Sequence, residues 1–168
     1  MKSVSLLLSC CLISICTFAQ MGGTDQEAKE AISKLAFIEG KWKGEGWMMG
    51  QDGQKNSFSQ TEDISFKLDG TALLIEGKGM DGDRTIHNAL AIVTYNKKDK
   101  SYSFQSYLAN GMNGKFKAEL IEDKFYWYPM GNMRYIIFLN EKGQWKEIGE
   151  MKQGENWFQF FEMTLDKQ

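Results

Sequence analysis

From residue 41 to the C-terminus, short runs of apolar and β-branched residues are separated by polar turn sequences about every eight to twelve residues. Apolar and polar positions alternate within most of these runs, as in a strand with one buried face. Asx-Gly pairs such as Asp52-Gly53 and Asp81-Gly82 favour tight hairpins, because both central residues adopt positive φ. The pattern predicts ten strands, at residues 41–49, 56–67, 71–79, 85–95, 101–109, 114–121, 124–129, 133–140, 144–152 and 156–166.

The links between these predicted strands are too short for parallel crossovers, which need a dozen or more residues, so the strands should form an antiparallel meander. Ten strands are many for an open sheet, and closure would remove both exposed edges. We therefore expect an all-β fold, a closed antiparallel up-and-down β-barrel, with a two-sheet sandwich as the alternative. Strands 85–95 and 133–140 are apolar on both faces, so one face could lie under a helix or against a second copy of the chain.

One short helix is predicted before the first strand. The sequence Thr24-Asp25-Gln26-Glu27 has the form of a capping box, in which a side chain satisfies free backbone N–H groups at a helix start. Apolar residues then recur at helical spacing until Gly40, where the pattern ends; they are Ala28, Ala31, Ile32, Leu35 and Ala36.

The first nineteen residues have the features of a secretory signal peptide. Lys2 precedes an apolar run over residues 4–18, which is shorter than the roughly 20 residues that span a bilayer. Small residues at Thr17 and Ala19 predict cleavage after Ala19, leaving a single domain at 20–168 without a stable membrane span. We expect an exported protein, periplasmic or extracellular. A retained anchor and a lipoprotein attached through Cys10 are the alternatives.

Composition excludes several classes of function for the mature chain. All three cysteines (Cys10, Cys11 and Cys16) lie in the predicted signal peptide, so the mature chain has no disulfide, thiol nucleophile or thiolate ligand. Removing 19 of the 168 residues leaves 149, enough for one apolar core, and the loss of Lys2 changes the net charge from −2 to −3. The charges are scattered, so we expect no nucleic-acid partner. With His87 as the only histidine, we expect no metal site and no cofactor.

The segment Gly40-Lys41-Trp42, directly after the predicted helix, resembles the opening of lipocalin-like (calycin) barrels. A wider set of segments is similar to a family of small bacterial proteins, domain-of-unknown-function family 1579; they are residues 40–46, 94–96, 133–135, 145–147 and 156–158. The resemblance covers nearly all of the mature chain and implies a closed barrel with a cavity for a small apolar ligand. It also implies that Trp42 and Arg134 form a structural plug across one barrel end.

Polar residues within apolar strands are the candidates for contacts in such a cavity. Glu147 shares a face with Trp145, Gly149 and Met151, so we expect it to point inward and to pair with Arg134 on the preceding strand. A sharper interpretation of Arg134 is that it binds a ligand carboxylate. The set of candidate ligand-binding residues is Arg134, Glu147, His87, Tyr95, Tyr107 and Trp127. Residues 77–82 match G-x-G-x-x-G, but a strand follows instead of a helix, so we interpret them as a glycine-rich hairpin.

These observations favour a non-catalytic barrel that binds a small apolar or amphipathic molecule. An enzyme that uses His87 and Glu147 as a cavity acid and base is the first alternative, although no nucleophile motif accompanies them. The second alternative is a protein-interaction or structural module of the cell envelope, with a homodimer formed through the strands that are apolar on both faces. The sequence leaves open whether aromatic and methionine side chains fill the barrel or line a pocket.

Overall fold

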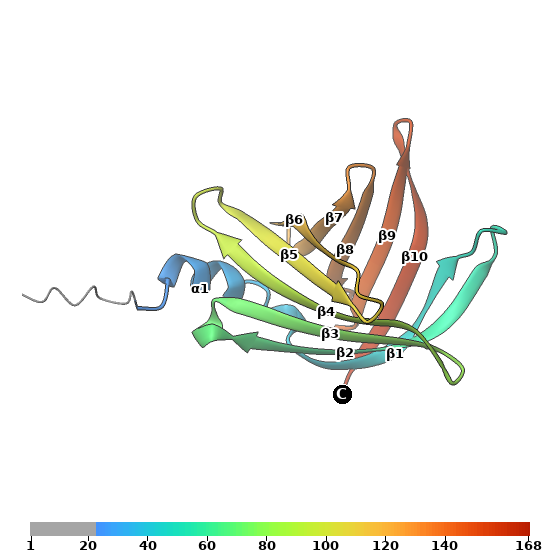
Figure 1. Ribbon diagram of the computed structural model, residues 1–168, viewed down its shortest axis with the longest axis horizontal. Helices are drawn as coiled ribbons and strands as arrows, with labels where there is room; N and C mark the ends of the chain where they lie inside the picture. The colour runs from blue at the N-terminus through green and yellow to red at the C-terminus, as the bar shows by residue number, and fades with distance from the viewer. Residues whose placement is uncertain (1–22) are drawn as a thin grey trace, which may run out of the picture.

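The computed structural model describes residues 23–168 and shows a sheet of ten strands with one short α-helix near its start (Figure 1). The predicted signal peptide, its cleavage site and Cys10 lie outside the described residues. The strands are β1 (Gly40–Met49), β2 (Lys55–Lys67), β3 (Ala72–Asp81), β4 (Arg84–Asn96), β5 (Ser101–Leu108), β6 (Asn113–Ile121), β7 (Lys124–Met130), β8 (Met133–Leu139), β9 (Trp145–Gln153) and β10 (Asn156–Lys167).

The sheet is a closed antiparallel barrel, which confirms the predicted fold class. Each strand pairs with its neighbours in the chain, and β1 pairs with both β2 and β10, so the described sheet has no free edge. The register shifts at three places, one of which lies between Trp127 and Met130 in β7. Pro129 falls within this irregularity, where its missing N–H does not interrupt the ladder.

Helix α1 (Gln26–Ser33) and the short 3₁₀ helix η1 (Ala36–Ile38) cover one end of the barrel (Figure 1). Asp25 caps α1, because its side chain accepts a hydrogen bond of 3.1 Å from the backbone N–H of Ala28. The Tyr102 hydroxyl on β5 donates a buried 2.7 Å hydrogen bond to the Ala31 carbonyl. No helix within residues 23–168 is long and apolar enough to cross a membrane.

Trp42 lies in the core beneath these helices, at what we call the closed end of the barrel. Its indole N–H donates to the Ile38 carbonyl at 2.9 Å, and its ring meets Trp145 edge to face at a centroid distance of 6.0 Å. The nearby cation is the ammonium of Lys167, 5.3 Å from the Trp42 ring centroid. Trp42 therefore closes this end together with Trp145 and Lys167.

The predicted plug of Trp42 and Arg134 is wrong in its second member. Arg134 lies on the outer face of β8, where its Nε donates to Glu150 at 2.7 Å and its guanidinium lies 4.0 Å from the Trp157 ring centroid. The reason is the parity of β8: Tyr135 and Ile137 point into the barrel, so Arg134, which precedes Tyr135, points out.

The Tyr102 hydrogen bond should anchor α1 to the barrel. We expect Tyr102→Phe to lower the free energy of unfolding by about 1–2 kcal/mol, because the buried Ala31 carbonyl loses its side-chain donor. Urea unfolding followed by far-UV circular dichroism measures this. The matched control is Tyr107→Phe on the outer face of the same strand, where the ring is 40% exposed. Equal losses in the two variants would contradict the assignment.

Candidate ligand-binding cavity

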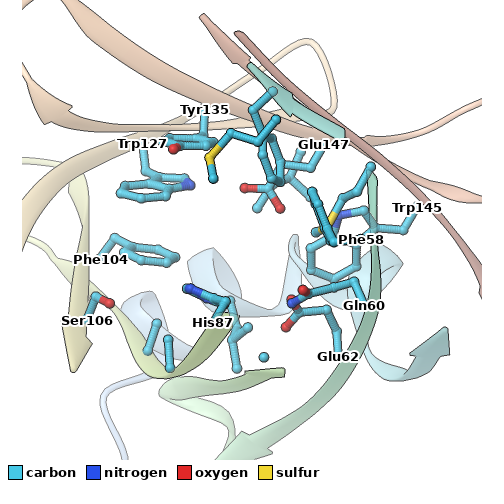
Figure 2. Close-up of a pocket in the computed structure, with 18 of the residues that line it drawn as sticks. Phe58, Gln60, Glu62, His87, Phe104, Ser106, Trp127, Tyr135, Trp145 and Glu147 are labelled. Carbon is cyan, nitrogen blue, oxygen red and sulfur yellow. The ribbon is translucent and has the colours of Figure 1, made fainter. Parts of the chain in front are cut away.

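The half of the barrel away from α1 is hollow. It contains a cavity of about 250 Å³ whose walls come from every strand except β6 (Figure 2). The walls are mostly apolar, and the apolar side chains that line them include Phe58, Ile75, Phe104, Ile137, Phe161 and Met163. The barrel is therefore filled at the closed end and open at the other.

The space exists because small side chains face large ones across the barrel. Gly77, Ala89, Ala91 and Ser106 bring β3, β4 and β5 to the cavity with little side-chain volume. Strands β7 to β10 contribute aromatic rings, namely those of Trp127, Tyr135, Trp145 and Phe161. This asymmetry leaves a gap where a core of uniform residue size would interdigitate.

Three aromatic rings form one wall. Trp127 stacks between Phe104 and Tyr135, with centroid distances of 4.5 Å and interplanar angles of 8° on both sides. Phe161 meets Tyr135 edge-on at 5.5 Å. Because each ring holds the next in place, the wall presents a fixed apolar surface to the cavity.

Two buried carboxyl groups point into this space. Glu62 on β2 is 7% exposed and Glu147 on β9 is 8% exposed. Gln60 donates a 2.6 Å hydrogen bond to Glu62 Oε1, whereas Glu62 Oε2 has no partner within residues 23–168. Figure 2 shows Glu147 on one side of the cavity, with Glu62 and Gln60 on the other.

Burial raises the pKa of both carboxyl groups. Desolvation raises the pKa of Glu62 to about 7, against the opposing effect of the Gln60 hydrogen bond. Desolvation and the negative charge of Glu62 raise the pKa of Glu147 to about 8. The indole N–H groups of Trp127 and Trp145 partly offset this rise, although neither satisfies the full geometry of a hydrogen bond. Near neutral pH protons are therefore retained on this pair of carboxyl groups.

Two further titratable side chains face the cavity. His87 lies at the mouth, next to the register shift between β3 and β4, and desolvation lowers its pKa below the usual range. Tyr135 on β8 faces the cavity with its pKa raised by burial and by the charge of Glu147. His87 therefore favours the neutral form, and Tyr135 stays protonated.

The structure brings together three of the candidate residues predicted from the sequence, namely Glu147, His87 and Trp127. Tyr95 lies instead at the closed end, where its ring contacts Tyr102 edge-on at 5.3 Å. Tyr107 and Arg134 are on the outer face. The predicted ion pair between Glu147 and Arg134 is wrong, because Arg134 pairs with Glu150 and Glu147 faces the barrel interior.

Sequence reasoning missed Glu62 and Gln60, although a signal for them was present. Both residues share the parity of Phe58 and Ile64 along β2, and all four are buried. Gly77 and Gly79 on the adjacent strand β3 lie directly opposite Glu62 and Gln60. A Cβ on Gly77 would lie 2.7 Å from Glu62 Oε1, and one on Gly79 would lie 2.6 Å from Gln60 Oε1. The glycine-rich hairpin thus makes room for the two polar side chains.

Comparison with known proteins supports the fold. The structure of Rv2717c from M. tuberculosis is similar, with a TM-score of 0.58 and 9% sequence identity over 82% of this chain and 97% of that chain. The structure of the S-type phycobiliprotein lyase CPES from Guillardia theta has a TM-score of 0.55 and 10% identity over 88% of this chain and 98% of that chain. Both are consistent with a lipocalin-like barrel fold.

No protein-family model matches the chain, and no curated protein matches it. The similarity to family 1579 stays a prediction from the sequence. Within residues 23–168, no group of three or more histidine, cysteine or acidic side chains is placed to hold a metal ion.

The raised pKa values predict that stability falls as pH rises. Both folded pKa values lie above the ordinary value of 4.5, so between about pH 5 and about pH 8 the folded state binds more protons than the unfolded state. The free energy of unfolding should fall by up to about 1.4 kcal/mol per pH unit for each group in this window. Urea unfolding across the window should show a shallower slope for Glu147→Gln than for wild type. The exposed Glu76→Gln serves as control, and parallel profiles for wild type and Glu147→Gln would contradict burial of the charge.

Gly77 should be required for the position of Glu62. We expect Gly77→Ala to displace the Glu62 carboxylate, break its hydrogen bond with Gln60 and cost about 1 kcal/mol in free energy of unfolding. Chemical denaturation compares it with Gly131→Ala, where an added Cβ meets nothing within 4 Å. A loss in Gly131→Ala as large as that in Gly77→Ala would point to a general effect of the substitution.

Proposed function

We propose that this protein is an exported, non-catalytic barrel that binds a small apolar or amphipathic molecule in its cavity. The observation that carries the proposal is a hollow of about 250 Å³ with an aromatic wall and buried polar atoms that have no partner within the described chain. Apolar walls with a few convergent polar groups are typical of small-molecule sites. An unpaired buried carboxylate lowers stability, so it is not expected in a barrel whose interior is simply filled by side chains.

The open end of the barrel supports entry of an apolar molecule. Met48 and Ile86 line the cavity and are also exposed, so they mark its mouth. Further exposed apolar side chains lie on strand ends and turns at the same end: Met49, Tyr107, Met112, Met130 and Phe158. Methionine adapts its shape to different partners, which suits a rim through which a ligand passes.

Acid–base catalysis is a second candidate, and one observation favours it. The pKa values of Glu62 and Glu147 lie near neutrality, where a general acid or base works best. A binding role and a catalytic role differ in what the Glu→Gln substitutions abolish. A catalytic role requires loss of turnover with retained binding, whereas a binding role requires a change in affinity.

Native mass spectrometry of the purified protein, followed by solvent extraction, tests the binding proposal. A single small molecule that co-purifies in stoichiometric amount would support it. Absence of a mass shift, together with no binding of an apolar fluorescent probe to the protein, would count against it.

A cavity-filling substitution should abolish this binding while the barrel stays folded. We expect Ser106→Leu to lower the affinity for an apolar probe about tenfold or more, because the new side chain occupies the cavity between β4 and β7. Ser103→Leu on the outward face of the same strand is the matched control and should bind as wild type does. Fluorescence titration measures the affinities, and equal affinities in the two variants would place the probe outside the cavity.

A further inference from the structure

Acidic side chains line the cavity, and no basic side chain among the described residues lies beside them. Among the described residues that line it, Glu62 and Glu147 are the acidic groups, and neither lysine nor arginine is present. Basic side chains such as Arg134 and Lys146 form ion pairs on the outer face instead, with Glu150 and Glu162 respectively. An internal counter-ion for the two carboxyl groups is thus missing from the described chain.

The other groups that face these carboxyl groups come from five strands. His87 on β4 faces them as a neutral imidazole, and Tyr135 on β8 as a protonated phenol. Trp127 on β7 and Trp145 on β9 present indole N–H groups. Gln60 on β2 occupies one oxygen of Glu62 and leaves the second free. None of these groups carries a full positive charge.

We propose that the cavity selects a small amphipathic cation, whose ammonium group is held by Glu62 and Glu147 while its apolar body lies against the Phe104–Trp127–Tyr135 wall. This inference rests on the proposed binding function and names the chemical class of its ligand. An ammonium group has donors for the free oxygen of Glu62 and for Glu147, and it supplies the missing counter-charge.

The alternatives fit the same walls less well. A carboxylate ligand would lie against two acidic groups and find no basic side chain there. A neutral ligand would supply no counter-charge, so any of the two carboxyl groups that ionised would remain an uncompensated buried charge. An ammonium group is attracted to the two carboxylates and also supplies their counter-charge.

Binding of a cation should release a proton. Near neutral pH the empty cavity retains protons on Glu62 and Glu147, because burial raises the pKa of both groups. A cation favours the ionised carboxylates and displaces a proton to solvent. Affinity should therefore increase from about pH 6 to about pH 8, in the opposite direction to the stability of the empty protein.

A set of three probes tests this ligand class. Phenethylammonium, phenethyl alcohol and phenylpropanoate share a ring and a short chain and differ in the charge of the head group. Quenching or shift of the tryptophan fluorescence reports binding, because Trp127 and Trp145 line the cavity. We expect the cation to bind about tenfold or more tightly than the alcohol, and the carboxylate to bind most weakly. Calorimetry in buffers of different ionisation enthalpy should show proton release with the cation alone.

Substitution of each carboxyl group tests whether Glu62 and Glu147 cause the preference for the cation. Glu62→Gln and Glu147→Gln should each weaken binding of the cation by about tenfold and leave binding of the alcohol unchanged or improved. Glu76→Gln is the matched control on the outer face of the adjacent strand β3 and should behave as wild type. Because glutamine is close to glutamate in size, the alcohol serves as an internal check that each variant keeps its cavity.

The outcomes separate this inference from the proposed function. Preference for the cation that disappears in both cavity variants supports it. Equal or tighter binding of the alcohol or the carboxylate overturns the ligand class and keeps the barrel as a binding protein. Binding of none of the three probes, in a protein that also carries no co-purified molecule, overturns both.

Discussion

Pairing of β1 with β10 is the contact on which the rest of this structure depends. It joins the first and last strands of the sheet through seven residue pairs and so turns a meander into a barrel. Gly44 on β1 makes the approach possible, because a Cβ there would collide with the Thr164 carbonyl on β10. Closure removes the sheet edges, and it also surrounds an interior that must be filled by side chains, water or a ligand.

The two ends of that interior have different physical characters. At the closed end, Trp42 and Trp145 pack beneath α1 and η1, and the indole N–H of Trp42 is satisfied by a backbone carbonyl. At the open end, small residues on β3 to β5 leave space, and two acidic groups face it without a counter-ion within the described chain. The first arrangement stabilises the fold. The second arrangement destabilises the fold at neutral pH. Buried groups with shifted pKa values cluster at functional sites.

A different set of charges forms ion pairs on the outer surface. Arg134, Glu150 and Trp157 form a contact on the outside of β8 to β10, which stabilises that wall and leaves the cavity free of arginine. This separation gives the cavity its acidic character. Because Arg134 points outward, Glu147 has no basic partner among the described residues that line the cavity.

The sequence alone determined the elements of this protein, because strand and turn signals are local. Alternation of apolar residues and the Asx-Gly turns located all ten strands to within about two residues, and the short links implied antiparallel closure. The parity of β9 also placed Glu147 inside, since its neighbours of the same parity are apolar. Only the tertiary structure decided the orientation of Arg134, because β8 is apolar on both faces and its pattern does not say which face is internal. It likewise decided that Glu62 is a cavity residue and that the barrel is hollow, since both depend on which side chains meet across the barrel from strands far apart in the chain.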